Sequence, residues 1–215
     1  DECRLLSSVR EAMERAHSRH AESTLCRSVR ARYASLTERE RQIFAGLVRG
    51  RQPAQDGLEQ ATRLSVSAVH ASRYVQAGVR RVADLGCGIG ADAMTMASAG
   101  LDVTAVELDE TTAAVATVNL TPFPETRVVQ ADVQSLDLDE LPGGRPEALW
   151  LDPARRETAG ASRRIFDPEA FSPPLSFVTD LADRGLSVGA KLGPGIPHEH
   201  VPRAAEAQWI SQHGD

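Results

Sequence analysis

The sequence predicts an α/β fold with a doubly wound, mainly parallel sheet, and three observations support this prediction. Short apolar runs alternate with segments of helical periodicity from residue 57 onward. A glycine-rich turn at residues 86–90 follows the first of these runs, and an acidic residue closes the second. Alternating strands and helices are typical of a parallel sheet that carries helices on both faces.

The composition is that of a globular chain. Its 215 residues are 41% hydrophobic and 25% charged, which is enough to bury a core. No apolar run reaches the roughly 18 residues of a membrane span, and no signal-peptide pattern is present, so no membrane partner is expected. Cys3, Cys26 and Cys87 are odd in number and widely spaced, which argues against a disulfide framework or a metal site. Their spacing is consistent with a cytoplasmic protein.

We expect two regions, a helical appendage over residues 1–50 and an α/β domain over residues 57–215, joined by a short linker. Residues 1–55 contain eleven arginines and seven acidic residues, an excess of four positive charges. Because the net charge of the chain is −6, the remainder carries −10. A basic segment can bind nucleic acid, but arginine–glutamate pairs on a solvated helix face produce the same excess.

The individual elements of the second region follow from apolar periodicity and from glycine stops such as Gly78 and Gly100. The expected helices cover residues 58–78, 91–100, 110–120 and 175–183. The expected strands cover residues 80–86, 101–108, 126–132, 147–153, 186–193 and 205–211.

The glycine-rich turn marks the candidate site. Ligands of open parallel sheets bind beyond the carboxyl ends of the strands, where the strand order reverses. Gly86, Gly88 and Gly90 permit positive φ and a close approach of the backbone to a ligand. The following helix offers free N–H groups. The turn also satisfies the loose dinucleotide pattern G-x-G-x-x-G/A, so a nicotinamide cofactor fits as well as any other adenosine cofactor.

Acidic residues near the strand ends help to distinguish between these possible cofactors. Asp84 would repel a pyrophosphate and attract a cationic amino-acid group. Glu107, about twenty residues further on, can accept hydrogen bonds from both hydroxyls of a ribose. Asp132 follows the third expected strand and can accept from an adenine amine, with the Val133 N–H facing the ring.

The combination of D-x-G-x-G-x-G, an acid closing the second strand and A-D after the third resembles class I S-adenosylmethionine-dependent methyltransferases. The resemblance covers residues from about 57 to the end and implies a Rossmann-like fold. It also implies that residues 84–90 hold the methionine part of S-adenosylmethionine, with Glu107 on the ribose and Asp132 on the adenine. The expected cofactor-binding residues are Gln60, Thr62, Asp84, Gly86, Cys87, Gly88, Gly90, Glu107, Leu108, Asp132 and Val133. A nicotinamide-binding domain and a domain that has lost its ligand are the alternatives.

The fourth expected strand ends in "LWLDPARR", residues 149–156. The segment resembles the D-P-P-R motif of several RNA base methyltransferases, with Ala154 in place of the second proline. This resemblance implies that Asp152, Pro153 and Arg155 are the catalytic residues, and that Asp152 orients an acceptor amine. Arg155 can instead hold a phosphate or pair with a surface acid.

Arg155 stands where the corresponding motif of amino-group methyltransferases has an aromatic residue. Flipped bases are usually sandwiched by aromatic rings, and Phe166 or Phe171 in the following loop can supply one. Trp150 lies inside the expected strand and is assigned to the core. Lys191 either faces the substrate pocket or extends along the sheet edge to solvent.

Longer segments, among them "GLEQATRLSVSAVHASRYVQAG" and "GAKLGPGIPHEHVP", resemble an actinobacterial group of class I methyltransferases with a THUMP-like C-terminal region. THUMP domains bind RNA in other enzymes, so the resemblance implies RNA as the substrate class. It also implies that the "EQAT" segment lies over the cofactor, where Gln60 and Thr62 contact the methionine carboxylate; the alternative for both is an exposed helix face. By the same resemblance, the domain over residues 57–215 is C-terminally truncated.

Residues 30–50, "RARYASLTERERQIFAGLVRG", resemble the linker and first helix of LuxR-type response regulators. The recognition helix that reads DNA would follow Gly50 and is absent, so DNA binding is not expected. A DNA-binding regulator fragment fused to an inactive cofactor-binding domain is the alternative to a methyltransferase. The oligomeric state is not predicted.

Overall fold

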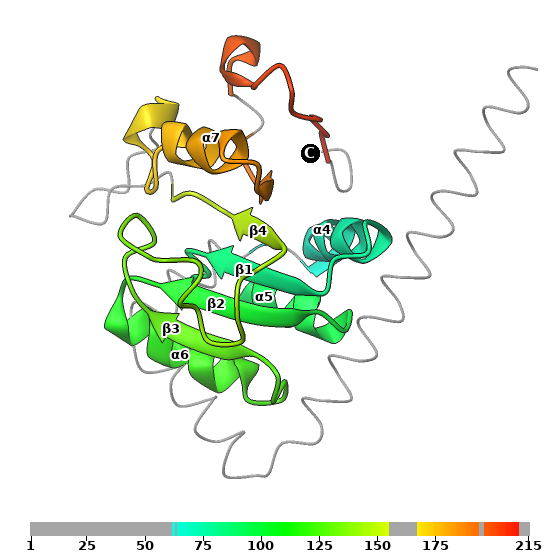
Figure 1. Cartoon of the computed structure of the whole chain (residues 1–215), viewed down its shortest axis with the longest axis vertical. Helices are drawn as coiled ribbons and strands as arrows, with labels where there is room; N and C mark the ends of the chain where they lie inside the picture. The colour runs from blue at the N-terminus through cyan, green and yellow to red at the C-terminus, as the bar shows by residue number, and fades with distance from the viewer. Residues whose placement is uncertain (1–61, 63, 155–166, 194–195, 211–215) are drawn as a thin grey trace, which may run out of the picture.

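The computed structural model describes residues 62, 64–154, 167–193 and 196–210 (Figure 1). The predicted helical appendage and linker therefore lie outside the described residues, as do Gln60, Arg155, Arg156 and Phe166. None of the described helices is both long and apolar enough to cross a bilayer.

The described strands form one sheet of five, all parallel, in the order β3-β2-β1-β4-β5. This confirms the predicted Rossmann-like, doubly wound fold. The strand order reverses between β1 and β4, so the ends of these two strands form the switch point where ligands of such sheets bind. The strands are β1 Arg81–Leu85, β2 Asp102–Glu107, β3 Arg127–Gln130, β4 Ala148–Leu151 and β5 Ser187–Ala190.

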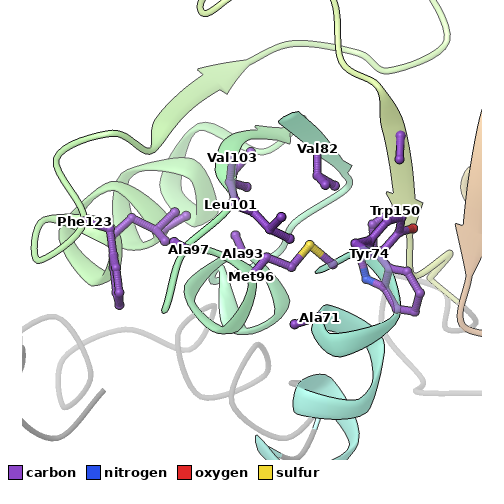
Figure 2. Close-up of a cluster of buried hydrophobic side chains, with 14 residues drawn as sticks. Ala71, Tyr74, Val82, Ala93, Met96, Ala97, Leu101, Val103, Phe123 and Trp150 are labelled. Atoms are coloured by element: carbon purple, nitrogen blue, oxygen red, sulfur yellow. The ribbon is translucent and has the colours of Figure 1, made fainter. Parts of the chain in front are cut away.

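Helices cover both faces of the sheet (Figure 1). They are α4 Leu64–Gln76, α5 Ala91–Ser98, α6 Glu110–Leu120 and α7 Leu175–Asp183, with short 3-10 turns at Pro168–Ala170 and His198–His200. Helices α4, α5 and α6 pack on one face, where Met96 meets Val82 and Val103 (Figure 2). Helix α7 packs on the other face.

Alternation within the strands explains these two layers. In β1, Val82 belongs to the cluster under α4 and α5, whereas Ala83 and Leu85 belong to the cluster under α7. Side chains of a strand alternate between faces, so Asp84 shares the side of Val82 and is enclosed by α5. Strands that are buried on both faces have continuous apolar sequences. The positions of these strands could therefore be predicted from the sequence.

The expected start of α4 and the expected end of β3 are wrong. Helix α4 begins at Leu64, and Thr62 precedes it outside the helix. Strand β3 ends at Gln130, because the chain turns at Asp132, whose Oδ1 accepts the Gln134 N–H at 2.9 Å.

The strand expected at residues 205–211 is not present, since residues 206–210 have no regular structure. This segment forms side-chain hydrogen bonds with α4 instead of pairing with the sheet. The Arg73 guanidinium donates to Glu206 at 2.7 Å and to Gln208 at 3.0 Å. Alternating apolar residues predicted a strand, but in the described chain this segment pairs with no strand.

Candidate functional site

The glycine turn connects β1 to α5 and is hydrogen-bonded to the neighbouring strand. The N–H groups of Gly86 and Cys87 both donate to the Val106 carbonyl, at 2.8 and 2.9 Å. Gly86, Gly88 and Gly90 all have positive φ, of 86°, 56° and 85°. A Cβ added at Gly86 or Gly88 would meet no atom within 4 Å, so the space above the turn is open to a ligand.

Glu107 supports this turn from the end of β2. Its Oε2 accepts the Gly88 N–H at 2.9 Å, and its Oε1 accepts the Asp109 N–H at 3.0 Å. A carboxylate has about four lone-pair sites, so these two bonds leave capacity for ribose hydroxyls. The two backbone donors fix the orientation of the carboxylate before any ligand arrives.

Asp84 lies within β1 beneath the turn and is only 1% exposed. Its Oδ2 has no hydrogen-bond partner. Burial raises the pKa of the Asp84 carboxyl well above its usual value, and the nearby charges of Asp92, Asp152 and Glu107 raise it further. A buried anion with an unsatisfied oxygen is costly, and a cationic ligand group would compensate for it.

Asp152 follows β4 at the switch point and is half-buried. The ammonium of Lys191 donates to Asp152 Oδ2, forming an ion pair. The same ammonium donates to Thr62 Oγ1 at 2.8 Å. Lys191 therefore faces the site, and the alternative in which it extends along the sheet edge is wrong.

Asp92, in the first turn of α5, was not predicted as a site residue. Its two carboxylate oxygens accept from Thr62 Oγ1 at 2.5 Å and Ser67 Oγ at 2.7 Å, and His70 Nδ1 lies 3.4 Å away. Burial alone would raise the pKa of the Asp92 carboxyl, but the hydrogen bonds from His70, Thr62 and Ser67 outweigh burial and lower it. In the sequence, the signal that could have identified Asp92 is a carboxylate among small and apolar residues directly after the glycine turn. The structure shows that this carboxylate is buried.

The remaining predicted cofactor residues lie around the turn. Leu108 is 61% exposed directly after Glu107, so an apolar surface borders the carboxylate. The Ala131 N–H donates to the Glu107 carbonyl at 3.0 Å, which holds the Asp132 loop beside the end of β2. Asp132 is exposed, and Val133 packs against the cluster under α7.

Cys87 packs against the core, and burial raises the pKa of its thiol well above the usual value. It therefore serves as a small apolar filler of the turn. Thr62 contacts Asp92 and Lys191, which places it within the site.

The segment after β4 forms a short antiparallel bridge with the segment that precedes α7. Pro153 is buried, and Ala154 exchanges two backbone hydrogen bonds with Ser172, at 2.9 and 3.1 Å. Phe171 is 7% exposed, so its ring is not presented to a substrate base, contrary to one of the two alternatives. Trp150 is buried as expected, with its ring 4.3 Å from that of His70.

Residues 83–141, which span β1 through the loop after β3, match the family model described as a methyltransferase domain. The matched residues make up about a quarter of the chain and are similar to a methyltransferase domain. This match agrees with the predicted enzyme class, a methyltransferase. No curated protein sequence matches the chain.

Several solved structures are similar. The N-terminal domain of EvdMO1 with SAH bound is 26% identical over 39% of this chain and 37% of that one, with a TM-score of 0.34. The tRNA (m1A58) methyltransferase TrmI from Aquifex aeolicus is 18% identical over 58% and 44%, with a TM-score of 0.40. The SAH-bound methyltransferase PaMTH1 from Podospora anserina is 9% identical over 71% and 58%, with a TM-score of 0.45. The chain spans less than two thirds of the length of each structure.

Proposed function

We propose that the chain transfers a methyl group from S-adenosylmethionine to an RNA base. The observation that carries the proposal is the open glycine turn, braced by Glu107 and placed over the unsatisfied Asp84 carboxyl, with Asp152 on the adjoining strand. S-adenosylmethionine supplies an activated methyl group on a sulfonium, which is a good leaving group.

The cofactor-binding role falls to the β1 and β2 ends. We assign the methionine part to the turn at residues 86–90, because its backbone is open and because a cationic ammonium or sulfonium would favour ionisation of the buried Asp84 carboxyl. Glu107 is assigned to the ribose, Leu108 to the face of the adenine, and Asp132 with Val133 to its edge. Thr62 and Gln60 are assigned to the methionine carboxylate.

The acceptor-binding role falls to the end of β4. Asp152 accepts a hydrogen bond from the acceptor amine and aligns the nitrogen lone pair with the methyl group. The N–C bond forms as the S–C bond of the sulfonium breaks, so catalysis is mainly alignment of an in-line transfer. Pro153 and the bridge between Ala154 and Ser172 fix the backbone that carries this carboxylate. Arg155 is assigned to a phosphate of the substrate.

RNA is proposed as the substrate for two reasons. The sequence D-P-A-R at residues 152–155 resembles the D-P-P-R of RNA base methyltransferases, and longer segments resemble a group with a THUMP-like region. Separately, we propose that the enzyme works in the cytoplasm, because its three cysteines are widely spaced and do not suggest a disulfide framework.

The first test is isothermal titration with S-adenosylhomocysteine, followed by transfer of a radiolabelled methyl group from S-adenosylmethionine to total cell RNA. Glu107→Ala should weaken binding about 10- to 100-fold, because hydrogen bonds to a charged acceptor are lost. Glu110→Ala removes an exposed glutamate three residues away and should leave binding unchanged. A folded wild-type chain that binds no S-adenosylhomocysteine would exclude the proposal, and binding without label in RNA would exclude the RNA substrate.

A further inference from the structure

We propose that Lys191 is a positioning residue for the methyl transfer, which holds the Asp152 carboxylate in its ionised form and couples it through Thr62 to Asp92 on the cofactor side. The inference deepens the proposed function and rests on it. It is carried by the backbone register, by the direction of the hydrogen bonds and by the charge of the site.

The backbone places Lys191 beside Asp152. Strands β4 and β5 are parallel, with Leu151 opposite Ala190, and the Lys191 N–H continues the ladder by donating to the Leu151 carbonyl at 2.8 Å. Asp152 and Lys191 are therefore the next opposed pair, and opposed residues of parallel strands project to the same side of the sheet. The ion pair thus follows from the sheet itself and not from a mobile surface side chain.

The hydrogen bonds beyond Lys191 have one possible direction. A threonine hydroxyl has a single proton to donate, and Thr62 donates it to Asp92 Oδ2 at 2.5 Å. Thr62 Oγ1 must therefore accept from Lys191, at 2.8 Å. Asp92 belongs to helix α5, whose N-cap residue is Gly90 of the glycine turn. One ammonium consequently links the end of β4 to the helix that begins at the cofactor turn.

The acidic groups of the site favour a cation beside Asp152. The charges of Asp152, of Asp92 in α5 and of Glu107 at the end of β2 all act on the buried Asp84 carboxyl in β1 and raise its pKa, so several acidic groups are gathered at this end of the sheet. Like charges disfavour ionisation of a carboxyl group, and an adjacent cation favours it. Among the described residues, Lys191 is the cation that forms a salt bridge with Asp152.

Two further titratable groups face this region from α4. His70 Nδ1 lies 3.4 Å from Asp92 Oδ1, so this ring contacts the cofactor side of the network. Tyr74 donates to the Leu149 carbonyl at 2.6 Å, and burial with the nearby Asp84 charge raises the pKa of its hydroxyl, so it stays neutral. Neither residue takes the place of an ammonium at Asp152.

The residue type is informative as well. The chain contains 24 basic residues of the lysine and arginine types, and Lys191 is its single lysine, so the other 23 are arginines. An ammonium is a compact charge that can donate in several directions from one nitrogen, whereas a guanidinium is a planar fork. The compact group reaches both Asp152 and Thr62 from one atom.

The test is the pH dependence of methyl transfer to total cell RNA at saturating S-adenosylmethionine. Lys191→Met should move the acidic limb of the kcat profile to higher pH, because the Asp152 carboxylate then has no ammonium beside it to favour its ionised form. The KM for S-adenosylmethionine should change less than kcat. Lys191→Arg retains the charge and should keep the limb near its wild-type position while lowering kcat.

The control is Arg127→Met, which removes a somewhat more exposed ion pair with Asp102, whose partners lie 2.7 Å apart. It should lower the Tm without moving the acidic limb. A wild-type chain that methylates RNA while Lys191→Met leaves the limb in place would overturn the role of Lys191 alone. A wild-type chain that binds S-adenosylhomocysteine and methylates no RNA would contradict the proposed function itself.

A second measurement applies even if Lys191→Met fails to fold. Labelling with ¹⁵N-lysine gives one side-chain ammonium signal, because the chain has one lysine. In the wild-type chain this signal should shift when Asp152 is protonated at acidic pH, and Asp152→Asn should abolish that step. A pH dependence that is the same in both proteins would overturn the coupling.

Discussion

The buried carboxyl of Asp84 destabilises the unliganded protein. It combines near-complete burial, an oxygen without a hydrogen-bond partner and three carboxylates that raise its pKa. A position of this kind is retained when a ligand compensates for it, and functional sites commonly sacrifice stability in this way. The same residue should therefore destabilise the free protein and strengthen binding of a cationic cofactor.

Asp84→Asn should raise the Tm of the unliganded chain at neutral pH, because the amide needs neither proton uptake nor charge burial. A typical single-substitution effect of about 1 kcal/mol would correspond to about 2–4 °C. The same substitution should weaken binding of S-adenosylmethionine, which carries the sulfonium charge, more than binding of the uncharged-sulfur product S-adenosylhomocysteine. Thermal unfolding and titration with both compounds provide the measurements. A lower Tm with unchanged binding would show that Asp84 is merely structural.

The raised pKa of Asp84 also predicts a pH dependence of stability. The native state holds the proton at pH values where the unfolded carboxyl, with its usual pKa of 3.8, has already released it. The contribution of Asp84 to the free energy of unfolding should therefore fall as the pH rises from about 4 through the raised native pKa. Comparing denaturant unfolding of the wild-type chain and Asp84→Asn across this range isolates the effect; parallel curves would contradict it.

At the scale of elements, the packing of α4 on β5 leaves no room at Gly189. A Cβ there would collide with Tyr74 Oη and would lie 3.0 Å from the Trp150 ring. Gly189→Ala should destabilise the chain by about 1–3 kcal/mol through overpacking. Ser187→Ala, at an exposed position of the same strand, serves as the control in thermal unfolding.

The clash at Gly189 is specific enough for a double-mutant test. Tyr74→Phe removes the hydroxyl that collides and also the hydrogen bond to the Leu149 carbonyl. The double variant should be less destabilised than the sum of the two single variants, because the second substitution relieves the first. Strict additivity would mean that the strand shifts away from α4 instead.

The elements themselves were largely predictable, and the site was predictable only in part. Buried parallel strands are continuous apolar runs, so β1, β2 and β4 could be located to within one or two residues. The turn glycines and Glu107 carry local signals of their own. The pairing of Asp152 with Lys191 depends on the register between β4 and β5, and no local pattern in either strand encodes that register. The contact of Thr62 with Asp92 likewise joins two segments 30 residues apart.

At the scale of the whole molecule, the strand order brings residues that are far apart in the sequence to one site. The reversal between β1 and β4 places the glycine turn beside Asp152, and parallel pairing with β2 adds Glu107. The segment at residues 206–210 shows the limit of such reasoning, since its apolar alternation predicted a strand while Arg73 binds its polar residues to α4.

A ligand that spans these strand ends should stabilise the whole domain. S-adenosylhomocysteine at about 100 times its Kd should add about 2.7 kcal/mol to the free energy of unfolding. For a domain of this size the Tm should rise by about 5–10 °C. The rise should shrink in Glu107→Ala at the same ligand concentration and persist in Glu110→Ala; an unchanged Tm in the wild-type chain would argue against a site that joins these strands.

The central claim is that the ends of β1 and β2 hold the adenosyl cofactor, and a crystal structure of the chain with S-adenosylhomocysteine tests it most directly. We expect the ribose hydroxyls within hydrogen-bonding distance of Glu107 and the amino-acid part against Gly86 and Gly88. A ligand bound elsewhere on the sheet, or one that leaves Glu107 uncontacted, would contradict the account.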